Sequence, residues 1–162
     1  MTSTPITVLI AEDDPVFRRV MSFSIARNGF TVESVGDGQA AYQRLCQGGV
    51  HFLVTDHQMP VCSGVQLLQR LAENPASKTI WPPTILCTAK GLELDSQGLL
   101  NRFNLVAIMH KPFSPRKLSE LIEKHVSIDP SAAPKQEGCV PDASSSIVPP
   151  GSDLSSGAAS HG

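Results

Sequence analysis

Five short runs of strand-forming residues set the strongest limit on how this chain folds. They cover residues 6–11, 31–35, 52–55, 84–87 and 106–109, and each stops at polar or turn-forming residues. Segments with apolar residues at helical spacing lie between them. Strands that alternate with helices in this way form a parallel sheet connected by right-handed crossovers.

The expected helices begin and end at local signals. Asp14-Pro15 opens the first helix, because aspartate caps a helix start and proline fits its first turn, and Asn28-Gly29 ends it. Further helices are expected over residues 40–46, 65–71 and 92–103, and a last helix opens at Ser114-Pro115 and continues to residue 126. Asn104 would end the fourth of these five helices in a left-handed conformation. These units predict a flavodoxin-like doubly wound α/β domain, (βα)5, with strand order 2-1-3-4-5.

The composition changes beyond residue 128. Of the 34 residues from 129 to 162, 22 are Pro, Ser, Gly or Ala, and none is aromatic. A segment of this kind buries too little apolar surface to offset its loss of conformational entropy on ordering. We therefore expect one domain over residues 1–128 and a disordered tail over 129–162.

Composition also narrows the classes of function. The formal net charge of −2 gives no reason to expect direct nucleic-acid binding, and no apolar run reaches the length of a membrane span. Residues 1–5 lack the features of a signal peptide. The four cysteines, at 46, 62, 87 and 139, show no C-x-x-C spacing, so neither a zinc site nor a disulfide framework is predicted. We expect a cytoplasmic protein.

Polar groups gather at the predicted carboxyl ends of the strands, where doubly wound folds place their ligands. Glu12-Asp13 follow the first strand, Asp56 the third, Thr88 the fourth and Lys111 the fifth. Neighbouring parallel strands lie just under about 5 Å apart, so these groups can share one pocket. Asp56 alone could equally close its strand as an Asx-turn or a helix cap.

This set of groups suits phosphoryl chemistry. Three carboxylates placed together repel one another unless a cation neutralises them, and Mg²⁺ prefers oxygen ligands. A hydroxyl and an ammonium beside a metal-bound carboxylate can hold a phosphoryl group, and Thr88 and Lys111 supply them.

Over residues 6 to about 126 the chain resembles a response-regulator receiver domain, the CheY-like phosphoacceptor module of two-component signalling. The resemblance rests on four stretches in order: Val8-Leu9-Ile10-Ala11-Glu12-Asp13-Asp14-Pro15, Leu53-Val54-Thr55-Asp56-His57-Gln58-Met59-Pro60 with Gly64, Ile85-Leu86-Cys87-Thr88-Ala89, and His110-Lys111-Pro112-Phe113.

The resemblance implies a role for each site residue. Asp56 matches the aspartate that accepts a phosphoryl group from a histidine kinase. Glu12 and Asp13 match the acidic pair that holds Mg²⁺, with Asp13 the direct ligand. Asp56 and the backbone carbonyl of Gln58 would complete the metal site. Thr88 and Lys111 match the groups that bind the acyl phosphate, and Lys111-Pro112 occupies the place of a cis peptide bond.

Two departures from the family pattern stand out. Ser63 replaces the usual aspartate before Gly64, and it can cap a helix equally well. Ile108 stands where many relatives have a tyrosine or phenylalanine that swings inward on activation. We therefore expect an activated change to centre on residues 89–95 rather than around Ile108. Gln58 and Lys90 match positions that tune phosphoryl lifetime in the family.

The favoured function is a stand-alone receiver that serves as a phosphorylation-controlled binding switch or a phosphorelay intermediate. Its partners would be a sensor histidine kinase or phosphotransfer protein and an unknown downstream protein, with no direct contact to nucleic acid or membrane. Its only chemistry would be Mg²⁺-dependent self-phosphorylation and autodephosphorylation.

Three alternative functions would require different residues. A phosphatase of the haloacid dehalogenase type would need a second aspartate where Gln58 stands. A flavodoxin-like cofactor binder would have Ser, Thr and Gly after the first strand, in place of Glu12-Asp13-Asp14-Pro15. A degenerate receiver used only for protein interaction would have no need of the intact acidic pair, Asp56, Thr88 and Lys111.

Overall fold

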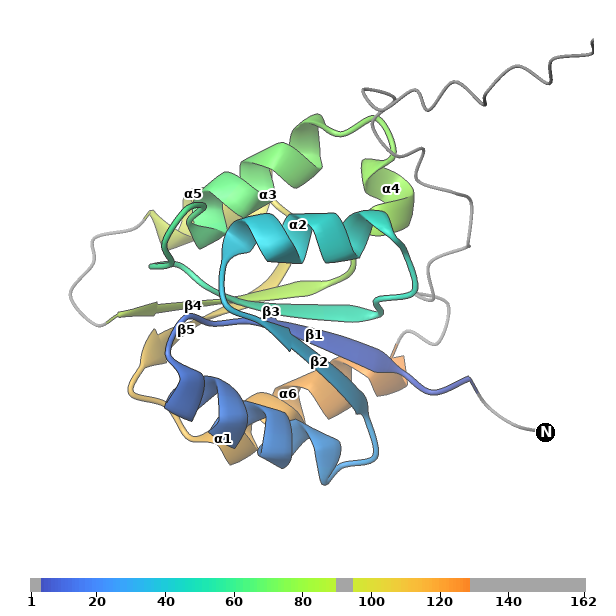
Figure 1. Ribbon diagram of the computed structural model, residues 1–162, viewed down its shortest axis with the longest axis vertical. Coiled ribbons are helices and arrows are strands. Elements are labelled where there is room, and N and C mark those ends of the chain that lie inside the picture. The colour runs from blue at the N-terminus through green and yellow to red at the C-terminus, as the bar shows by residue number, and fades with distance from the viewer. Residues whose placement is uncertain (1–3, 90–94, 129–162) are drawn as a thin grey trace, which may run out of the picture.

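The computed structural model describes residues 4–89 and 95–128, which form one parallel five-stranded sheet with helices on both faces (Figure 1). The strand order is β2-β1-β3-β4-β5. The strands are β1 (Thr7–Ala11), β2 (Thr31–Val35), β3 (Phe52–Asp56), β4 (Thr84–Ala89) and β5 (Leu105–Lys111). The predicted fold class and strand order are therefore confirmed.

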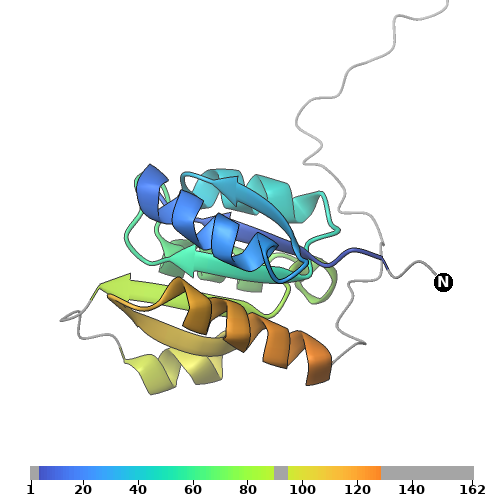
Figure 2. The same cartoon turned by 90° about the horizontal axis from the view of Figure 1, so that it is seen from below.

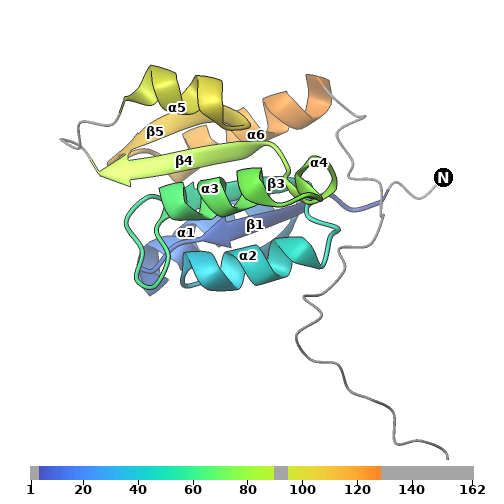
Figure 3. The same cartoon turned by 90° about the horizontal axis from the view of Figure 1, so that it is seen from above.

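Among the described residues, two helices cover one face of the sheet and four lie on the other. The helices are α1 (Pro15–Ala26), α2 (Gly38–Cys46), α3 (Gly64–Glu73), α4 (Ser77–Ile80), α5 (Ser96–Arg102) and α6 (Pro115–Ile128). Figure 2 shows α1 and α6 together on one face, and Figure 3 shows α2, α3, α4 and α5 on the opposite face.

Alternating side chains of the strands build a separate core on each face. Val8 and Ile10 of β1 pack with Met21 and Ile25 of α1 and with Leu118 of α6. The intervening residues of the same strands face the other way, where a second core forms from Leu9, Leu53, Ala41, Leu45, Leu67 and Leu71. Burial on both faces explains why the strands of this parallel sheet are almost continuously apolar.

The helix caps confirm two sequence predictions. The Asp14 carboxylate accepts hydrogen bonds from the backbone N–H of Val16 (2.8 Å) and Phe17 (3.1 Å) at the start of α1. The Ser63 hydroxyl accepts one from the N–H of Gln66, whose side chain accepts one from the N–H of Ser63 in return. Serine therefore caps α3 as aspartate would.

Other element boundaries differ from the predictions. Strand β5 continues through His110 to Lys111 because it is an edge strand, where exposed polar side chains such as His110 are tolerated. The short helix α4 lies between Pro75 and Pro82, where the sequence predicted only a connection. Of the helix expected over 92–103, α5 provides Ser96–Arg102, and residues 92–94 lie outside the described residues.

The prediction for Asn104 was wrong. Among the described residues, Val61 is the only non-glycine with a positive φ. Phe103 caps the end of α5 with extended backbone angles, and the carbonyl oxygen of Asn104 accepts a hydrogen bond from the N–H of Thr84 (3.2 Å). The chain therefore enters β5 directly. Within the described residues, no helix has the length and apolar character needed to cross a membrane.

Candidate functional site

The predicted site residues meet at one edge of the sheet, where the strands end. Glu12 and Asp13 directly follow β1, and Asp56 is the last residue of β3. The strand register places Asp56 beside Cys87 and Ala89 beside Lys111, so Thr88 and Lys111 belong to the same edge. The structure therefore brings together the side chains of Glu12, Asp13, Asp56 and Lys111, and the strand register places Thr88 at the same edge.

Three carboxylates form the centre of this site. Glu12, Asp13 and Asp56 each offer an oxygen atom, and these oxygens lie within 4.8 Å of one another. Glu12 and Asp56 are buried, with 1% and 6% of their surface exposed, whereas Asp13 is exposed. Clustered carboxylate oxygens with one side open to solvent suit a hard divalent cation that keeps part of its water shell, as Mg²⁺ does.

Lys111 supplies the positive charge next to these carboxylates. Its Nζ lies 2.8 Å from Oε2 of Glu12 and 3.3 Å from Oδ1 of Asp56. The same ammonium lies 4.8 Å from the centroid of the Phe17 ring, a distance that allows a cation–π interaction. Lys111 thus bridges two carboxylates in a partly buried position.

Burial and pairing act in opposite directions on these groups. Burial raises the pKa of Asp56 above its ordinary value, although the charge of Lys111 and its hydrogen bond oppose this effect. Burial likewise raises the pKa of Glu12 against the hydrogen bond from Lys111. For Lys111, burial lowers the pKa, but the hydrogen bond to Glu12 and the charge of Asp56 outweigh it, so its pKa rises overall. The ammonium is therefore firmly protonated.

Glu12 is held by contacts to both its main chain and its side chain. Its Oε1 accepts a hydrogen bond from the N–H of Asp14 (3.1 Å), while Oε2 accepts the one from Lys111. Its backbone N–H donates to the carbonyl of Val35 (3.1 Å), and its carbonyl accepts from Nη1 of Arg18 (2.8 Å). No pattern in the sequence indicated the contact of Arg18 with Glu12.

The loop after β3 approaches Asp56 closely. The N–H of His57 donates to the carbonyl of Cys87 (2.7 Å), and the N–H of Gly64 donates to the carbonyl of His57 (2.9 Å). A Cβ atom at Gly64 would overlap the carbonyl oxygen of Asp56, so only glycine allows this approach. Gln58 lies exposed in this loop, and the role of its carbonyl as a metal ligand stays a prediction.

Thr88 is fully buried, yet its hydroxyl has no partner. Among the described residues, Oγ1 of Thr88 and Nδ1 of His57 are the buried side-chain polar atoms without a hydrogen bond. A buried hydroxyl without a partner is costly, so a ligand that could accept its hydrogen bond would be favoured. The Lys111-Pro112 peptide bond is cis, as the resemblance implied.

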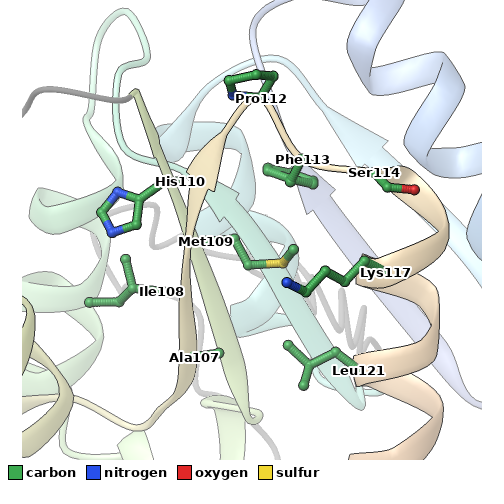
Figure 4. Close-up of a pocket in the computed structure, with 9 residues that line it drawn as sticks. All are labelled: Ala107, Ile108, Met109, His110, Pro112, Phe113, Ser114, Lys117 and Leu121. Atoms are coloured by element: carbon green, nitrogen blue, oxygen red, sulfur yellow. The ribbon is translucent and has the colours of Figure 1, made fainter.

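Ile108 lies on β5, three residues before Lys111. It is half-buried and packs against a small core of Leu68, Leu86 and Phe103. Figure 4 shows Ile108 on one side of β5 and Met109 on the other, with Lys117 and Leu121 of α6 beside Met109. These residues line a cavity of about 560 Å³. Residues 90–94, including Lys90 and most of the segment expected to move, lie outside the described residues.

Helix α1 carries apolar residues that do not reach the core. Val16, Val20 and Phe23 are 71%, 46% and 66% exposed, and their spacing places them on one face of the helix. The sequence showed apolar residues around much of this helix but could not tell which face packs inward. The buried face is formed by Met21 and Ile25.

Comparison with known proteins identifies the family of this chain. A family model of the response regulator receiver domain matches residues 8–123. TrcR, a transcriptional regulatory protein of Mycobacterium tuberculosis, is 30% identical over 122 residues, which cover 75% of this chain and 44% of TrcR. The chain therefore spans less than half the length of this relative.

Solved structures show the same arrangement of strands and helices. The structure of FixJ-N is similar with a TM-score of 0.63 and 28% identity, covering 77% of this chain and 96% of that one. CheY4, a chemotaxis response regulator of Vibrio cholerae, has a TM-score of 0.65 at 21% identity, covering 75% and 98% of the two chains. The chain belongs to the response regulator receiver domain family of two-component signalling.

Proposed function

We propose that this protein accepts a phosphoryl group on Asp56 from the phosphohistidine of a sensor kinase or phosphotransfer protein. The phosphorylated form then serves as a binding switch or as an intermediate that passes the group on. The observation that carries this proposal is the placement of a buried Asp56 carboxylate within 3.3 Å of the Lys111 ammonium and next to Glu12 and Asp13.

The transfer itself needs only one nucleophile. An Oδ atom of Asp56 attacks phosphorus, the bond between phosphorus and the histidine nitrogen breaks, and that nitrogen keeps the electron pair and takes a proton from solvent. The product is an acyl phosphate on Asp56. Because the carboxylate must be ionised to attack, the neighbouring ammonium of Lys111 favours the reactive form against the effect of burial.

The surrounding residues would hold the transferred group. Glu12, Asp13, Asp56 and the carbonyl of Gln58 would bind Mg²⁺, which when bound neutralises charge on the phosphoryl oxygens. Lys111 can donate to one of those oxygens, which would draw its ammonium away from Glu12. The unpartnered hydroxyl of Thr88 can donate to another.

The exposed apolar face of α1 supports docking of a protein donor rather than of a small molecule alone. Helix α1 begins directly after the acidic pair, so Val16, Val20 and Phe23 extend from the site along the helix. Burying large exposed side chains of this kind is a common source of binding energy between proteins.

Several predictions are part of the same proposal. We propose that the chain divides into a receiver over residues 1–128 and a tail over 129–162. Its only chemistry would be self-phosphorylation and autodephosphorylation, and its location would be cytoplasmic. It would not bind nucleic acid directly. The name of TrcR describes a transcriptional regulator, but this chain matches only 44% of it.

The alternative is a degenerate receiver that binds proteins without being phosphorylated. Phosphotransfer separates the two possibilities. Purified histidine kinases and phosphotransfer proteins, each carrying labelled phosphohistidine, would be mixed briefly with the wild type, Asp56→Asn and Phe23→Asn. We expect label on the wild type only with a cognate donor, none on Asp56→Asn, and slower transfer to Phe23→Asn. Strong binding of a donor without any transfer of label would support the degenerate receiver instead.

A further inference from the structure

Arg18 connects helix α1 to the main chain at the acidic pair. Its Nη1 donates a hydrogen bond of 2.8 Å to the carbonyl oxygen of Glu12. The arginine is half-buried, and its backbone N–H donates to the carbonyl of Asp14 (2.9 Å). The first turn of α1 therefore fixes the backbone position from which the side chain extends. The guanidinium thus reaches back from the helix to the loop that follows β1.

The carbonyl that Arg18 holds belongs to the peptide unit between Glu12 and Asp13. A peptide unit is planar, so fixing the direction of the Glu12 carbonyl also fixes the direction of the Asp13 N–H and the position of its Cα. Asp13 has little other support. It is exposed, and within the described part of the chain its carboxylate makes no hydrogen bond or ion pair.

A second contact limits where the guanidinium can lie. A Cβ atom added at Gly36, in the turn between β2 and α2, would come within 3.1 Å of Nη1 of Arg18. The neighbouring carbonyl of Val35 accepts the N–H of Glu12. Val35 at the end of β2 therefore binds the Glu12 main chain, and Gly36 next to it leaves space for the Arg18 guanidinium.

From these contacts we propose that Arg18 positions Asp13 for Mg²⁺ binding by orienting the Glu12–Asp13 peptide unit. The proposal rests on the proposed function, because it takes the three carboxylates of Glu12, Asp13 and Asp56 as the metal site. Arg18 does not touch the metal or the phosphoryl group in this role. It acts through the main chain, as supporting residues around metal ligands commonly do.

The sign of the change in metal affinity separates this role from a simple effect of charge. Arg18→Met removes the donor and keeps much of the stem. Loss of a positive charge near a cation site should by itself tighten Mg²⁺ binding. Loss of positioning should weaken it, and supporting residues of metal ligands typically contribute about 10-fold or more in affinity. We expect the dissociation constant for Mg²⁺, measured by titration calorimetry on the full chain, to rise roughly 10-fold.

Three further variants complete the test. Arg19→Met removes the same charge from an exposed position one residue along α1 and should leave the affinity unchanged or slightly tighter. Arg18→Lys keeps one donor and should recover part of the loss. Gly36→Ala keeps every charge but crowds Nη1 of Arg18, which must then shift slightly, so it should weaken binding less than Arg18→Met does. Without metal, the amide resonance of Asp13 should shift in Arg18→Met and not in Arg19→Met.

The outcomes distinguish this inference from the proposed function. A wild type that does not bind Mg²⁺ would contradict the proposed metal site itself. A wild type that binds Mg²⁺, with Arg18→Met binding as tightly or more tightly, would overturn the role of Arg18 alone. If Arg18→Met does not fold, Arg18→Lys and Gly36→Ala decide the matter, since unchanged affinity in both would overturn the inference.

Discussion

The ammonium of Lys111 lies closer to Glu12 than to Asp56, at 2.8 Å from Oε2 of Glu12 and 3.3 Å from Oδ1 of Asp56. Glu12 is the more deeply buried of the two carboxylates. In the unphosphorylated protein, Lys111 therefore serves mainly to neutralise Glu12. A phosphoryl group on Asp56 would compete with Glu12 for this ammonium, so we expect the Lys111–Glu12 pair to oppose activation.

Removal of Lys111 should leave Glu12 as a buried charge without a cation. We expect Lys111→Met to lower the free energy of unfolding by roughly 1–3 kcal/mol at pH 7 without metal, the usual penalty for a buried group that loses its partner. Chemical denaturation would measure this loss. Because protonated Glu12 needs no cation, the loss should shrink as the pH falls toward 5.

A second substitution tests the cause of that loss. Glu12→Gln in the Lys111→Met background removes the unpaired charge and should recover part of the stability. Lys117→Met serves as a control, since Lys117 is an exposed lysine of α6. A double variant no more stable than Lys111→Met would show that packing of the lysine stem, not pairing with Glu12, causes the loss.

Repulsion among the carboxylates of Glu12, Asp13 and Asp56 should destabilise the metal-free fold. Burial and the negative charges of Asp13 and Glu12 disfavour ionised Asp56. We expect Asp13→Asn to raise the melting temperature slightly without metal and to remove the stabilisation that Mg²⁺ gives the wild type. The rise should be small because Asp13 is exposed and its repulsion is screened. A clear drop in the metal-free melting temperature would contradict this expectation.

The strands and the site were predictable because their signals are local. Each strand is a short apolar run, and parallel strands bring their carboxyl ends to one edge, so Asp13, Asp56 and Lys111 had to lie near one another. The contact of Arg18 with Glu12 was not predictable, because it depends on the rotamer of a long side chain. The exposure of Val16 and Phe23 depends on how α1 packs against the sheet and α6, which no local pattern specifies.

His51 provides a contact between segments far apart in the sequence. Its Nδ1 accepts a hydrogen bond of 3.0 Å from the backbone N–H of Thr7, and burial lowers its pKa. A lowered pKa means that the unfolded chain binds the proton more tightly. The stability that His51 contributes is therefore complete above pH 6.5, its ordinary value, and is lost as the pH falls through the lowered pKa.

His51→Asn tests this contribution, because an amide oxygen can accept from Thr7 but does not titrate. Urea unfolding at pH 7.5 and at pH 5.5 should show that the wild type gains less stability on acidification than the variant does. Protonation of Asp56 and Glu12, whose pKa values are raised, acts in the opposite direction in both proteins. The difference should stay below the ~1.4 kcal/mol per pH unit that one full proton gives. Equal pH dependence in both proteins would contradict the proposed role of His51.

Ile108 should change little on activation. It is stiff at χ1 and packs against Leu86 and Phe103, so it has few alternative positions. With beryllofluoride and Mg²⁺ in place of the phosphoryl group, we expect the largest amide shifts outside the site in the segment 89–95. Larger shifts at Ile108 and Met109 than in that segment would show that the edge of β5 responds instead.

Asp56 as the phosphoacceptor is the central claim, and intact-mass measurement tests it most directly. The full chain would be incubated with acetyl phosphate and Mg²⁺, in parallel with Asp56→Asn, and reduction with borohydride would mark the residue that carries an acyl phosphate. We predict one added phosphoryl group on the wild type, its reduction product at Asp56, and no addition to Asp56→Asn. A phosphoryl group that persists in Asp56→Asn, or a reduction product at Asp13 or Glu12, would contradict the claim.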